Sequence, residues 1–303
     1  MRRLLLSFTV LLGSLSCVAD EARVNPPRPS ITGIAHVLIR VSDKDSARDF
    51  YGKSLGLGVN SADCGAPDSP CFFLSGSQFV APVHGDVNSL PSFVTQVAFA
   101  TNNVPGLYQY LVSHGVHLSE VSISGSGRQF IVMNDPEGHR IAFVESRPRE
   151  ITSASSQVST RLIHAGFVVK DRAAEDKFYK DILGFHVYWH GGMKDGEDNW
   201  VDMQVPDGTD WIEYMLGVSP DASHKTLGVM NHIALGVPDI HAAQQQLIKN
   251  GWKGTEEPKI GRDGKWQLNL YDPDETRVEL MEFTPTKEPC CSPYTGPHPG
   301  PKQ

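Results

Sequence analysis

Short apolar runs alternate along the chain with stretches in which apolar residues recur at helical spacing. Residues 164–169 form one such run, rich in β-branched side chains, and predict a strand. In residues 171–183 the apolar side chains of Ala174, Phe178 and Ile182 stand four positions apart, which predicts a helix. Three further strands are predicted at residues 185–189, 200–205 and 211–216. Together these elements make one βαβββ module.

The scheme recurs in the rest of the chain. A strand is predicted at residues 232–237, a helix at 240–250, and later strands at 266–271 and 277–283. The N-terminal part repeats this pair of modules, because residues 34–59 align without gaps on residues 162–187 at an offset of 128.

Later matches have larger offsets, 136 for residues 96–99 on 232–235 and 137 for residues 135–137 on 272–274. The polar segment 191–199 accounts for the growth in offset, and such insertions belong in surface loops. The sequence therefore predicts an α+β fold of four βαβββ modules in two copies. We place the copies at residues 31–147 and 161–283, with a linker at 148–160 and a Pro-rich tail at 284–303.

The N-terminus has a separate pattern. Arg2 and Arg3 precede an apolar run, residues 4–15, which is shorter than a membrane span, and small residues follow it. This order is typical of a secretory signal peptide, so we expect residues 1–19 to be cleaved and the protein to be periplasmic or extracellular. Ser14 matches the lipoprotein cleavage site poorly, so a lipid anchor at Cys17 is the less favoured alternative.

Charge and cysteines narrow the expectations further. The net charge of −8 argues against nucleic acid or an anionic membrane surface as a partner. Cys64 and Cys71 flank a Pro/Gly-rich segment, where a local disulfide is plausible in an exported protein. Cys290 and Cys291 are adjacent in the tail, which we expect to be extended or disordered. They are either two exposed thiols or a vicinal disulfide without a role in the main site.

Four side chains occupy matching points of the C-terminal copy. His164 and His232 begin the first strands of its two modules, and Glu213 and Glu279 lie in the last strands. A lone His or Glu in a strand is usually structural, but here both residue types recur in both modules. If the modules face each other about a pseudo-twofold axis, the four side chains converge. Two imidazoles and two carboxylates suit one divalent metal, Zn, Ni, Mn or Fe(II), with open positions for water or substrate.

The N-terminal copy lacks this set. His36 matches the first histidine of the C-terminal copy, but Gln96 stands in place of the second and Ala142 in place of Glu279. The other glutamate has no evident counterpart, and the nearest strand holds Gln78-Phe79-Val80. Because one imidazole without partners is a weak transition-metal site, we interpret this copy as structural, or as half of an apolar pocket.

The motifs of the C-terminal copy resemble the vicinal oxygen chelate superfamily, which contains glyoxalase I, fosfomycin-resistance proteins, methylmalonyl-CoA epimerases and extradiol dioxygenases. The resemblance is carried by Phe178-Tyr179-Lys180-Asp181-Ile182-Leu183-Gly184, by His232-Ile233-Ala234-Leu235, and by Asp272-Pro273-Asp274 with Val278-Glu279. It implies two curved mixed-sheet half-barrel domains. It also implies metal ligation by His164, His232 and Glu279, with Glu213 at the fourth position of glyoxalase I-like members.

The resemblance leaves three functions open. The first is a glyoxalase-like lyase or isomerase acting on a small oxygen-chelating substrate, with Glu213 or Glu279 as general base and an enolate-type intermediate. The second is an Fe(II) extradiol-type dioxygenase. Its usual signature has a Tyr at another spacing from Pro273 and an additional His upstream, whereas this chain has Tyr271 two residues before that proline.

The third alternative is a non-catalytic binding or resistance protein that holds a small molecule in an aromatic pocket. Its candidate lining residues are Tyr188, Trp200, Trp211, Tyr214 and Trp266, each of which is more often ordinary sheet core. Arg262 and Lys265 could contact an anionic substrate, although we favour solvated loop charges. Four modules in one chain can complete their own sites, so both a monomer and a homodimer are compatible with the sequence.

Overall fold

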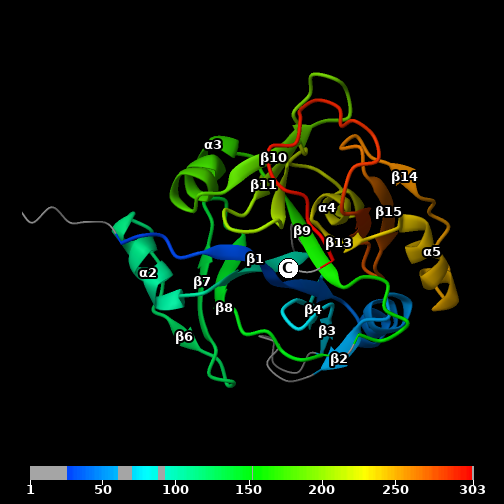
Figure 1. Ribbon diagram of the computed structural model, residues 1–303, viewed down its shortest axis with the longest axis horizontal. Helices are drawn as coiled ribbons and strands as arrows, with labels where there is room; N and C mark the ends of the chain where they lie inside the picture. Colours follow the sequence, from blue (N-terminus) through cyan, green and yellow to red (C-terminus); the bar gives the residue numbers. More distant parts are fainter. Residues whose placement is uncertain (1–25, 61–69, 88–92, 152, 302–303) are drawn as a thin grey trace, which may run out of the picture.

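The computed structural model describes residues 26–60, 70–87, 93–151 and 153–301. They form two eight-stranded mixed sheets, one in each copy, with few helices (Figure 1). No helix in these ranges is long and apolar enough to cross a membrane. The predicted signal peptide and its Cys17 lie outside the described residues.

The elements follow the predicted order in both copies. The N-terminal copy contains β1 (Ile31–Val41), α1 (Lys44–Ala47), the π-helix η1 (Arg48–Ser54), β2 (Gly58–Asn60), β3 (Cys71–Phe73), β4 (Phe79–His84), β5 (Val94–Thr101), α2 (Val104–Ser113), β6 (Ser122–Ile123), β7 (Gln129–Asn134) and β8 (Arg140–Glu145). The C-terminal copy contains β9 (Arg161–Val168), α3 (Arg172–Glu175), the π-helix η2 (Asp176–Ile182), β10 (His186–Gly191), β11 (Trp200–Gln204), β12 (Trp211–Met215), α4 (His224–Met230), β13 (His232–Val237), α5 (Ile240–Lys249), β14 (Lys259–Ile260), β15 (Trp266–Tyr271) and β16 (Arg277–Glu282).

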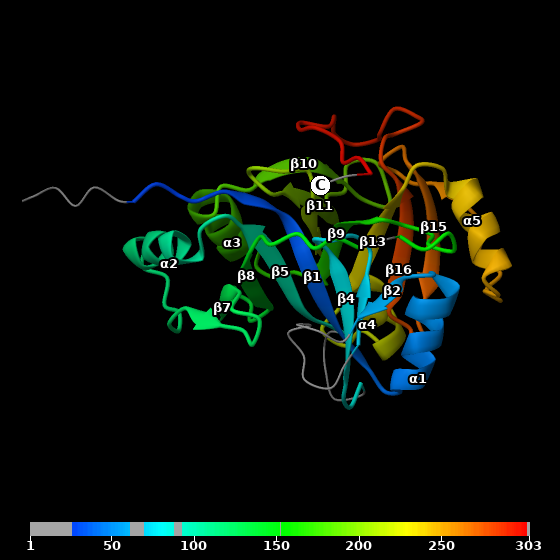
Figure 2. The same cartoon turned by 60° about the horizontal axis from the view of Figure 1, so that its bottom comes forward.

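The two sheets have the same topology. Their strand orders are β2-β3-β4-β1-β5-β8-β7-β6 and β10-β11-β12-β9-β13-β16-β15-β14. The first strands of the two modules pair antiparallel at the centre of each sheet, β1 with β5 and β9 with β13. The last strand of each module runs parallel beside its first strand, as β12 does beside β9 and β16 beside β13. The predicted fold of tandem βαβββ modules in curved mixed sheets is confirmed (Figure 2).

Individual residues determine where the first helix of the C-terminal copy begins and ends. Asp171 caps its start by accepting a hydrogen bond from the Ala174 backbone N–H. The single helix predicted at residues 171–183 is a short α-helix, α3, continued by the π-helix η2. Gly184 ends it with a φ of 80°, a left-handed conformation that favours glycine. The short helix α4 was not predicted, because its seven residues lie between two recognisable modules.

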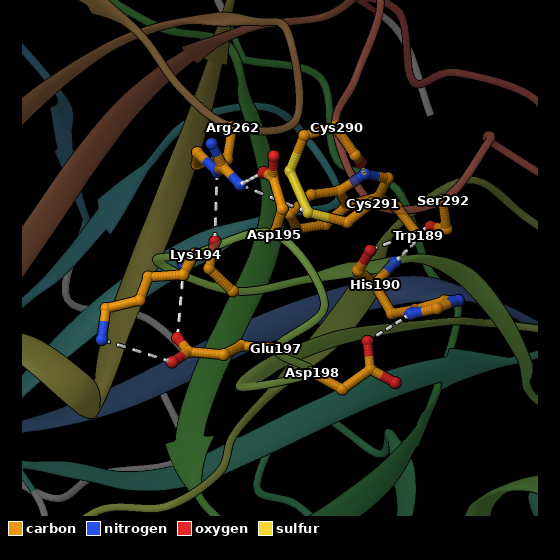
Figure 3. Close-up of a disulfide and its surroundings, with 11 residues drawn as sticks. Trp189, His190, Lys194, Asp195, Glu197, Asp198, Arg262, Cys290, Cys291 and Ser292 are labelled. Carbon is orange, nitrogen blue, oxygen red and sulfur yellow. Dashed lines mark hydrogen bonds and ion pairs between the residues drawn. A yellow bond between two sulfur atoms is a disulfide. The ribbon is translucent and has the colours of Figure 1, made fainter.

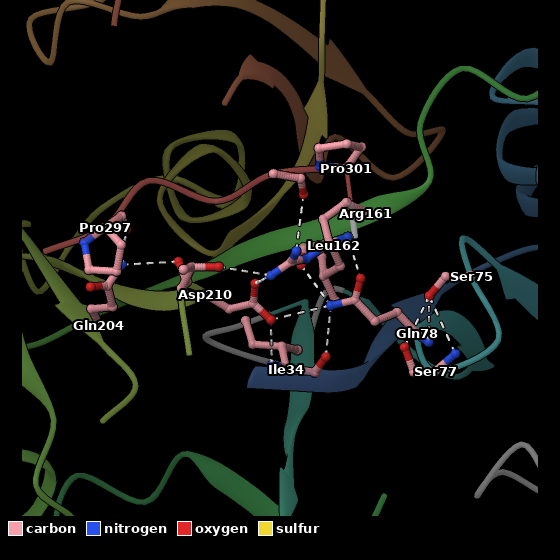
Figure 4. Close-up of polar contacts among 12 residues, drawn as sticks. Ile34, Ser75, Ser77, Gln78, Arg161, Leu162, Gln204, Asp210, Pro297 and Pro301 are labelled. Atoms are coloured by element: carbon pink, nitrogen blue, oxygen red, sulfur yellow. Dashed lines mark hydrogen bonds and ion pairs between the residues drawn. The ribbon is translucent and has the colours of Figure 1, made fainter. Parts of the chain in front are cut away.

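A buried polar network joins the copies (Figure 4). Gln78 Nε2 donates to the backbone carbonyls of Ile34 and Leu162, both at 2.8 Å, and so bridges the central strands of the two sheets. Asp210, at the position equivalent to Gln78, accepts from the Ile34 backbone N–H at 2.8 Å and pairs with the buried Arg161 guanidinium. Loss of one partner of this ion pair, which lies within the C-terminal copy, costs roughly 3–5 kcal/mol. The pair holds Asp210 in place for its hydrogen bond to Ile34 of the other copy.

Two further hydrogen bonds cross between the copies at equivalent places. The hydroxyl of Tyr179 donates to Asp135 at 3.1 Å, and the hydroxyl of Tyr51 donates to Asp272 at 3.0 Å. Each bond joins the first helix of one copy to the last hairpin of the other. The recurring Phe-Tyr and Asp-Pro motifs of the sequence therefore contribute two of the contacts between the duplicated units.

The C-terminal tail follows the surface of the C-terminal sheet without forming a helix or strand. The Thr295 backbone N–H donates to the Tyr188 carbonyl at 3.0 Å, and the Pro297 carbonyl accepts from Gln204 at 2.9 Å. Further along, the Gly300 carbonyl accepts from Arg161 at 3.0 Å. Of the two predicted alternatives, extended or disordered, the tail is extended. These hydrogen bonds hold it against the sheet along its length.

Cysteine pairing is settled for the tail only. Cys290 and Cys291 form a vicinal disulfide, which rules out the alternative of two exposed thiols. Cys71 is also disulfide-bonded. Its predicted partner, Cys64, lies outside the described residues, so that pairing stays a prediction.

One of the two inter-copy contacts contains an additional buried acid, which makes stability pH-dependent. Burial and the charge of Asp135 raise the pKa of Glu175 from 4.5 to about 8, whereas the equivalent position of the other copy holds Ala47. Between these pKa values the folded state keeps a proton that the unfolded state has lost, so stability falls as pH rises from about 4.5 to about 8. We expect the free energy of unfolding of Glu175→Gln, measured with urea at pH 5 and pH 8, not to show this decrease, because the amide does not ionise.

Glu120→Gln, at an exposed position, serves as the control and should keep the pH dependence of the wild type. Equal losses of stability in the wild type and in Glu175→Gln would contradict the burial of an ionisable proton at this contact.

Candidate metal centre

The pairing of β9 with β13 brings two histidines together. Its register sets His164 opposite Ala234 and His232 opposite Gly166, so both imidazoles project from the same face of the sheet. Their Nε2 atoms lie 3.0 Å apart, and both side chains are almost completely buried. The expected convergence of the first strands of the two modules is found here.

Gly166 makes room for this arrangement. A Cβ atom at this position would lie 2.2 Å from His232 Cε1, far inside the contact distance. In the N-terminal copy the equivalent residue is Leu38, which pairs with Gln96. A glycine within an apolar strand often indicates that another group approaches the backbone closely. Gly166 could therefore have indicated the position of His232 from the sequence.

The two glutamates come from the strands that flank this central pair. Glu213 Oε2 lies 2.9 Å from His232 Nε2 and 3.5 Å from His164 Nε2. Glu279 Oε2 lies 3.8 Å from His164 Nε2. Ligand atoms of His164, His232 and Glu279 all lie within 4.8 Å of one another, a group that could hold a metal ion. The four residues singled out from the sequence therefore lie together.

Hydrogen bonding orients His232 as a ligand. Its Nδ1 lies 3.0 Å from the Met230 carbonyl, which can only accept, so Nδ1 carries the proton. Its Nε2 then presents a lone pair to the centre, the tautomer that metal-binding histidines adopt. In this structure Nε2 accepts a hydrogen bond from Arg277 at 2.7 Å. The residues present therefore fit a divalent metal.

Burial keeps the donor set in suitable protonation states. It lowers the pKa of His164 well below 6.5, helped by the charges of His232 and Arg277, so the imidazole is neutral and one of its ring nitrogens offers a lone pair. Burial also raises the pKa of Glu279 to about 7, an effect that the Arg277 charge reduces. For Glu213 burial acts in the same direction, but the neighbouring His232 and the positive charge of Arg277 together outweigh it, and the pKa is lowered. An uncompensated carboxyl pair this deep is costly, and a cation would remove the cost.

A cavity of about 470 Å³ is lined by three of these residues, His164, Glu213 and Glu279. Aromatic side chains line it, two of them, Trp200 and Trp211, among those proposed from the sequence. Two other candidates face elsewhere, since Tyr214 lies in the main core and Tyr188 packs against the tail residue Tyr294. Trp266 is also absent from the lining and packs on the main core. The cavity has the size and the apolar wall of a small-molecule site.

Asp202 is a cavity-lining acid that the sequence did not single out. It lies opposite Glu213 in the β11–β12 pair and is only 5% exposed. Its carboxyl group has no hydrogen-bond partner among the described residues, and burial with the nearby Glu213 charge raises its pKa well above 3.8. A buried carboxyl group without a protein partner is available to a bound molecule.

The vicinal disulfide lies beside Trp189 and Arg262 (Figure 3). Trp189 Nε1 donates to the Cys290 carbonyl at 3.1 Å, and Arg262 Nη2 lies 3.7 Å from Cys291 Sγ. Both Trp189 and Arg262 line the cavity, so the disulfide supports two of its walls. Arg262 also pairs with the exposed Asp195. The disulfide therefore lies next to the cavity, and its expected lack of a role in the main site stays a prediction.

Lys265 was expected as a solvated loop charge, and this prediction is wrong. The side chain is fully buried, with Nζ 4.7 Å from the ring centre of Trp211 and 5.2 Å from those of Tyr188 and Tyr294. Cation–π attraction compensates part of the cost of burial. The tail supplies one of the three rings, and this contact could not be read from the local sequence.

The N-terminal copy has no comparable group at the equivalent positions. Gln96 Nε2 lies 3.3 Å from His36 Nε2, and His36 stacks on Phe79 at 4.6 Å. The strand register identifies the residue of the N-terminal copy that is equivalent to Glu213, which the sequence alone did not identify. Phe79 pairs with His36 as Trp211 pairs with His164, so Ala81 takes the position of Glu213, and Ala142 takes that of Glu279. Alanines thus replace both carboxylates.

Comparisons with known proteins agree with this architecture. A sequence model of the Glyoxalase/Bleomycin resistance protein/Dioxygenase superfamily matches residues 33–143 and 161–280. No curated protein sequence matches the chain. The similar solved structures include homoprotocatechuate 2,3-dioxygenase from Brevibacterium fuscum in an anaerobic complex with 3,4-dihydroxyphenylacetate. It has 20% identity and a TM-score of 0.63, and the match covers 88% of this chain and 86% of that one.

The homoprotocatechuate 2,3-dioxygenase of Arthrobacter globiformis is similar to the same degree, with 20% identity and a TM-score of 0.62 over 84% of this chain and 81% of that one. Likeness at this identity shows the fold alone. The superfamily match, in contrast, covers most of the chain and falls on both copies. The chain therefore belongs to the glyoxalase/bleomycin resistance protein/dioxygenase superfamily, also called the vicinal oxygen chelate superfamily.

Proposed function

We propose that the protein is a metal-dependent lyase or isomerase of the glyoxalase type, acting on a small substrate that chelates the metal through two oxygens. The observation that carries this proposal is the position of Glu213, whose Oε2 lies within 3.5 Å of both imidazole Nε2 atoms. Two histidines and two glutamates fill four positions around one ion and leave two for substrate oxygens. Little room is then left for O₂ beside a chelating substrate.

The two glutamates have different surroundings, which favours one of them as the base. The Glu213 side chain is 13% exposed, whereas that of Glu279 is 4% exposed. A divalent ion at this centre supplies Lewis-acid polarisation of the substrate oxygens. Glu213 would detach from the ion and take a proton from the carbon next to the polarised carbonyl group, while Glu279 would remain a ligand. His232, held by the Met230 carbonyl, keeps its orientation throughout.

Cavity walls position the substrate for this proton transfer. Trp200 and Trp211 provide flat apolar surface, and Asp202 provides a carboxyl group beside Glu213. We assign Asp202 to a hydrogen bond with a substrate oxygen, because its carboxyl group accepts no hydrogen bond from the described residues. Such a bond fixes the substrate relative to the base and lowers the entropic part of the barrier.

A second candidate is an Fe(II) extradiol-type dioxygenase. Two observations favour it, the buried group of His164, His232 and Glu279 and the fold shared with homoprotocatechuate 2,3-dioxygenases. In this reading Glu213 would have to leave its place beside the imidazoles. Tyr271 lines the cavity but is 37% exposed, so it is not held in a buried position near the histidines.

Metal binding is tested by paired histidine substitutions in equivalent strands. We expect His164→Ala to lose the bound divalent metal, because one of only two imidazoles is removed. His36→Ala, at the equivalent position of the N-terminal copy, should keep the metal. Metal content per chain is measured by inductively coupled plasma mass spectrometry after gel filtration. Equal metal content in the two variants would contradict the site.

The reaction class is tested with Glu213→Gln. Loss of a positioned general base lowers proton-transfer rates by about 10²–10⁴-fold. We expect the metal-loaded wild type to exchange the C–H protons next to the carbonyl of dihydroxyacetone in D₂O, as followed by ¹H NMR. Glu213→Gln should retain metal but lose most of this exchange.

Oxygen uptake with 3,4-dihydroxyphenylacetate, measured on the Fe(II)-loaded protein in the same study, distinguishes the second candidate. Uptake without proton exchange would overturn the lyase or isomerase proposal in favour of the dioxygenase. Small-molecule binding that persists after metal removal, with neither reaction, would instead indicate a binding protein.

A further inference from the structure

A second cavity, of about 370 Å³, lies between the two copies. Arg40 and Thr95 of the N-terminal copy line it, together with Val168 and Asn231 of the C-terminal copy. These are equivalent pairs, because Arg40 aligns with Val168 at an offset of 128 and Thr95 with Asn231 at 136. The cavity therefore straddles the pseudo-twofold axis that relates the copies. We call it the inter-copy cavity.

Cations gather in the inter-copy cavity from both copies. Arg40 and Arg140 come from strands of the N-terminal copy, and Lys170 follows the central strand of the C-terminal copy. None of the three forms an ion pair with a carboxylate among the described residues. Since the whole chain has a net charge of −8, this concentration of unpaired positive charge departs from the general composition.

Arg40 is the least satisfied of these cations. Its side chain is partly buried, and its Nε is buried without a hydrogen-bond partner among the described residues. Leaving a buried donor unpaired destabilises the folded protein, and the cost is greater for a charged group. The equivalent residue of the other copy is Val168, so the fold does not require a cation at this position.

The one lining carboxylate, Glu137, forms no ion pair with the three cations, which outnumber it. Glu137 accepts hydrogen bonds from the Lys170 backbone N–H at 2.8 and 3.0 Å and from that of Asp171. Its oxygens are thus used by the backbone. Nearby, the Asp135 carboxylate lies 2.8 Å from His139 Nδ1, so it is paired with that imidazole and not with the cations of the cavity.

We propose that the inter-copy cavity binds a small oxyanion with two negative charges, either a phosphate or a dicarboxylate. The guanidinium groups of Arg40 and Arg140 present planar donors suited to such oxygens, and the Lys170 ammonium adds a third charge. The cavity is wide enough for a molecule of a few heavy atoms and opens to solvent between the copies. This site is separate from the candidate metal centre and does not depend on the reaction proposed for it.

One helix connects the two cavities. Leu227 of α4 and Asn231, which follows it, line the inter-copy cavity, whereas Met230 of the same segment lines the metal-centre cavity. Asn231 directly precedes His232, and the Met230 carbonyl orients the imidazole of that histidine. An anion bound between the copies thus lies one helix away from a candidate metal ligand.

The test measures binding of inorganic phosphate and of malonate to the full chain by isothermal titration calorimetry, with NaCl added to keep the ionic strength constant. The titrations use Glu279→Ala, which removes a candidate metal ligand, so that anion binding to a metal does not contribute. We expect one site per chain for at least one anion, and the stronger binder identifies the phosphate or dicarboxylate class. Absence of binding by both anions would overturn the proposal without bearing on the metal centre.

Substitutions that introduce the equivalent residue of the other copy locate the site. In the same background Arg40→Val, matching Val168, should weaken binding by about tenfold or more, the effect of one charge-assisted hydrogen bond. Lys170→Ser, matching Ser42, should weaken it by about threefold, as expected for an exposed charge. Lys253→Ser, an exposed control in another loop, should leave the affinity unchanged.

Thermal unfolding without ligand checks that Arg40→Val is folded. If Arg40→Val does not fold, Lys170→Ser still tests the site, because Lys170 is exposed and its replacement should not disturb folding. Affinities for both anions that are the same in Lys170→Ser, Lys253→Ser and the parent protein would overturn the assignment to this cavity.

Discussion

The antiparallel pairing of β9 with β13 is the constraint on which the candidate metal centre depends. It places the two histidines on one face with their Nε2 atoms 3.0 Å apart, and the parallel strands on either side then carry the two glutamates to the same point. Gly166 is part of this constraint, because any larger side chain would collide with His232. The centre is therefore a property of the junction between two modules, and neither module could form it alone.

The duplication separates the roles of the two copies. The N-terminal copy has the same strand order, but alanines replace both carboxylates and Gln96 replaces a histidine, so it contributes fold and contact surface. The buried network around Gln78 and Asp210 joins it to the C-terminal copy, which contains the candidate metal centre. The copies also differ in sequence where they meet. Arg40 is equivalent to Val168, and Glu175 is equivalent to Ala47, so the cation of the inter-copy cavity and the buried acid each occur in one copy only.

Much of this could be predicted from the sequence, because periodicity and repetition are local properties. The four modules, the strands that carry the metal-centre residues and the convergence of His164, His232, Glu213 and Glu279 all follow from matching two halves of one copy. Contacts between distant segments could not be predicted in this way. The aromatic surroundings of Lys265 need a ring from the tail, and the counterpart of Glu213 emerged only when strand register identified Ala81. Asp202 was missed because an acid in an alternating strand usually faces water.

The central claim is that one copy holds a metal and the other does not. Anomalous diffraction from crystals of the protein grown with Mn²⁺, Zn²⁺ or Ni²⁺, recorded at the absorption edge of that metal, tests it most directly. The account predicts a single strong peak among His164, His232, Glu213 and Glu279 and none near His36. A peak at His36, or no peak at the four residues with any of these metals, would contradict it.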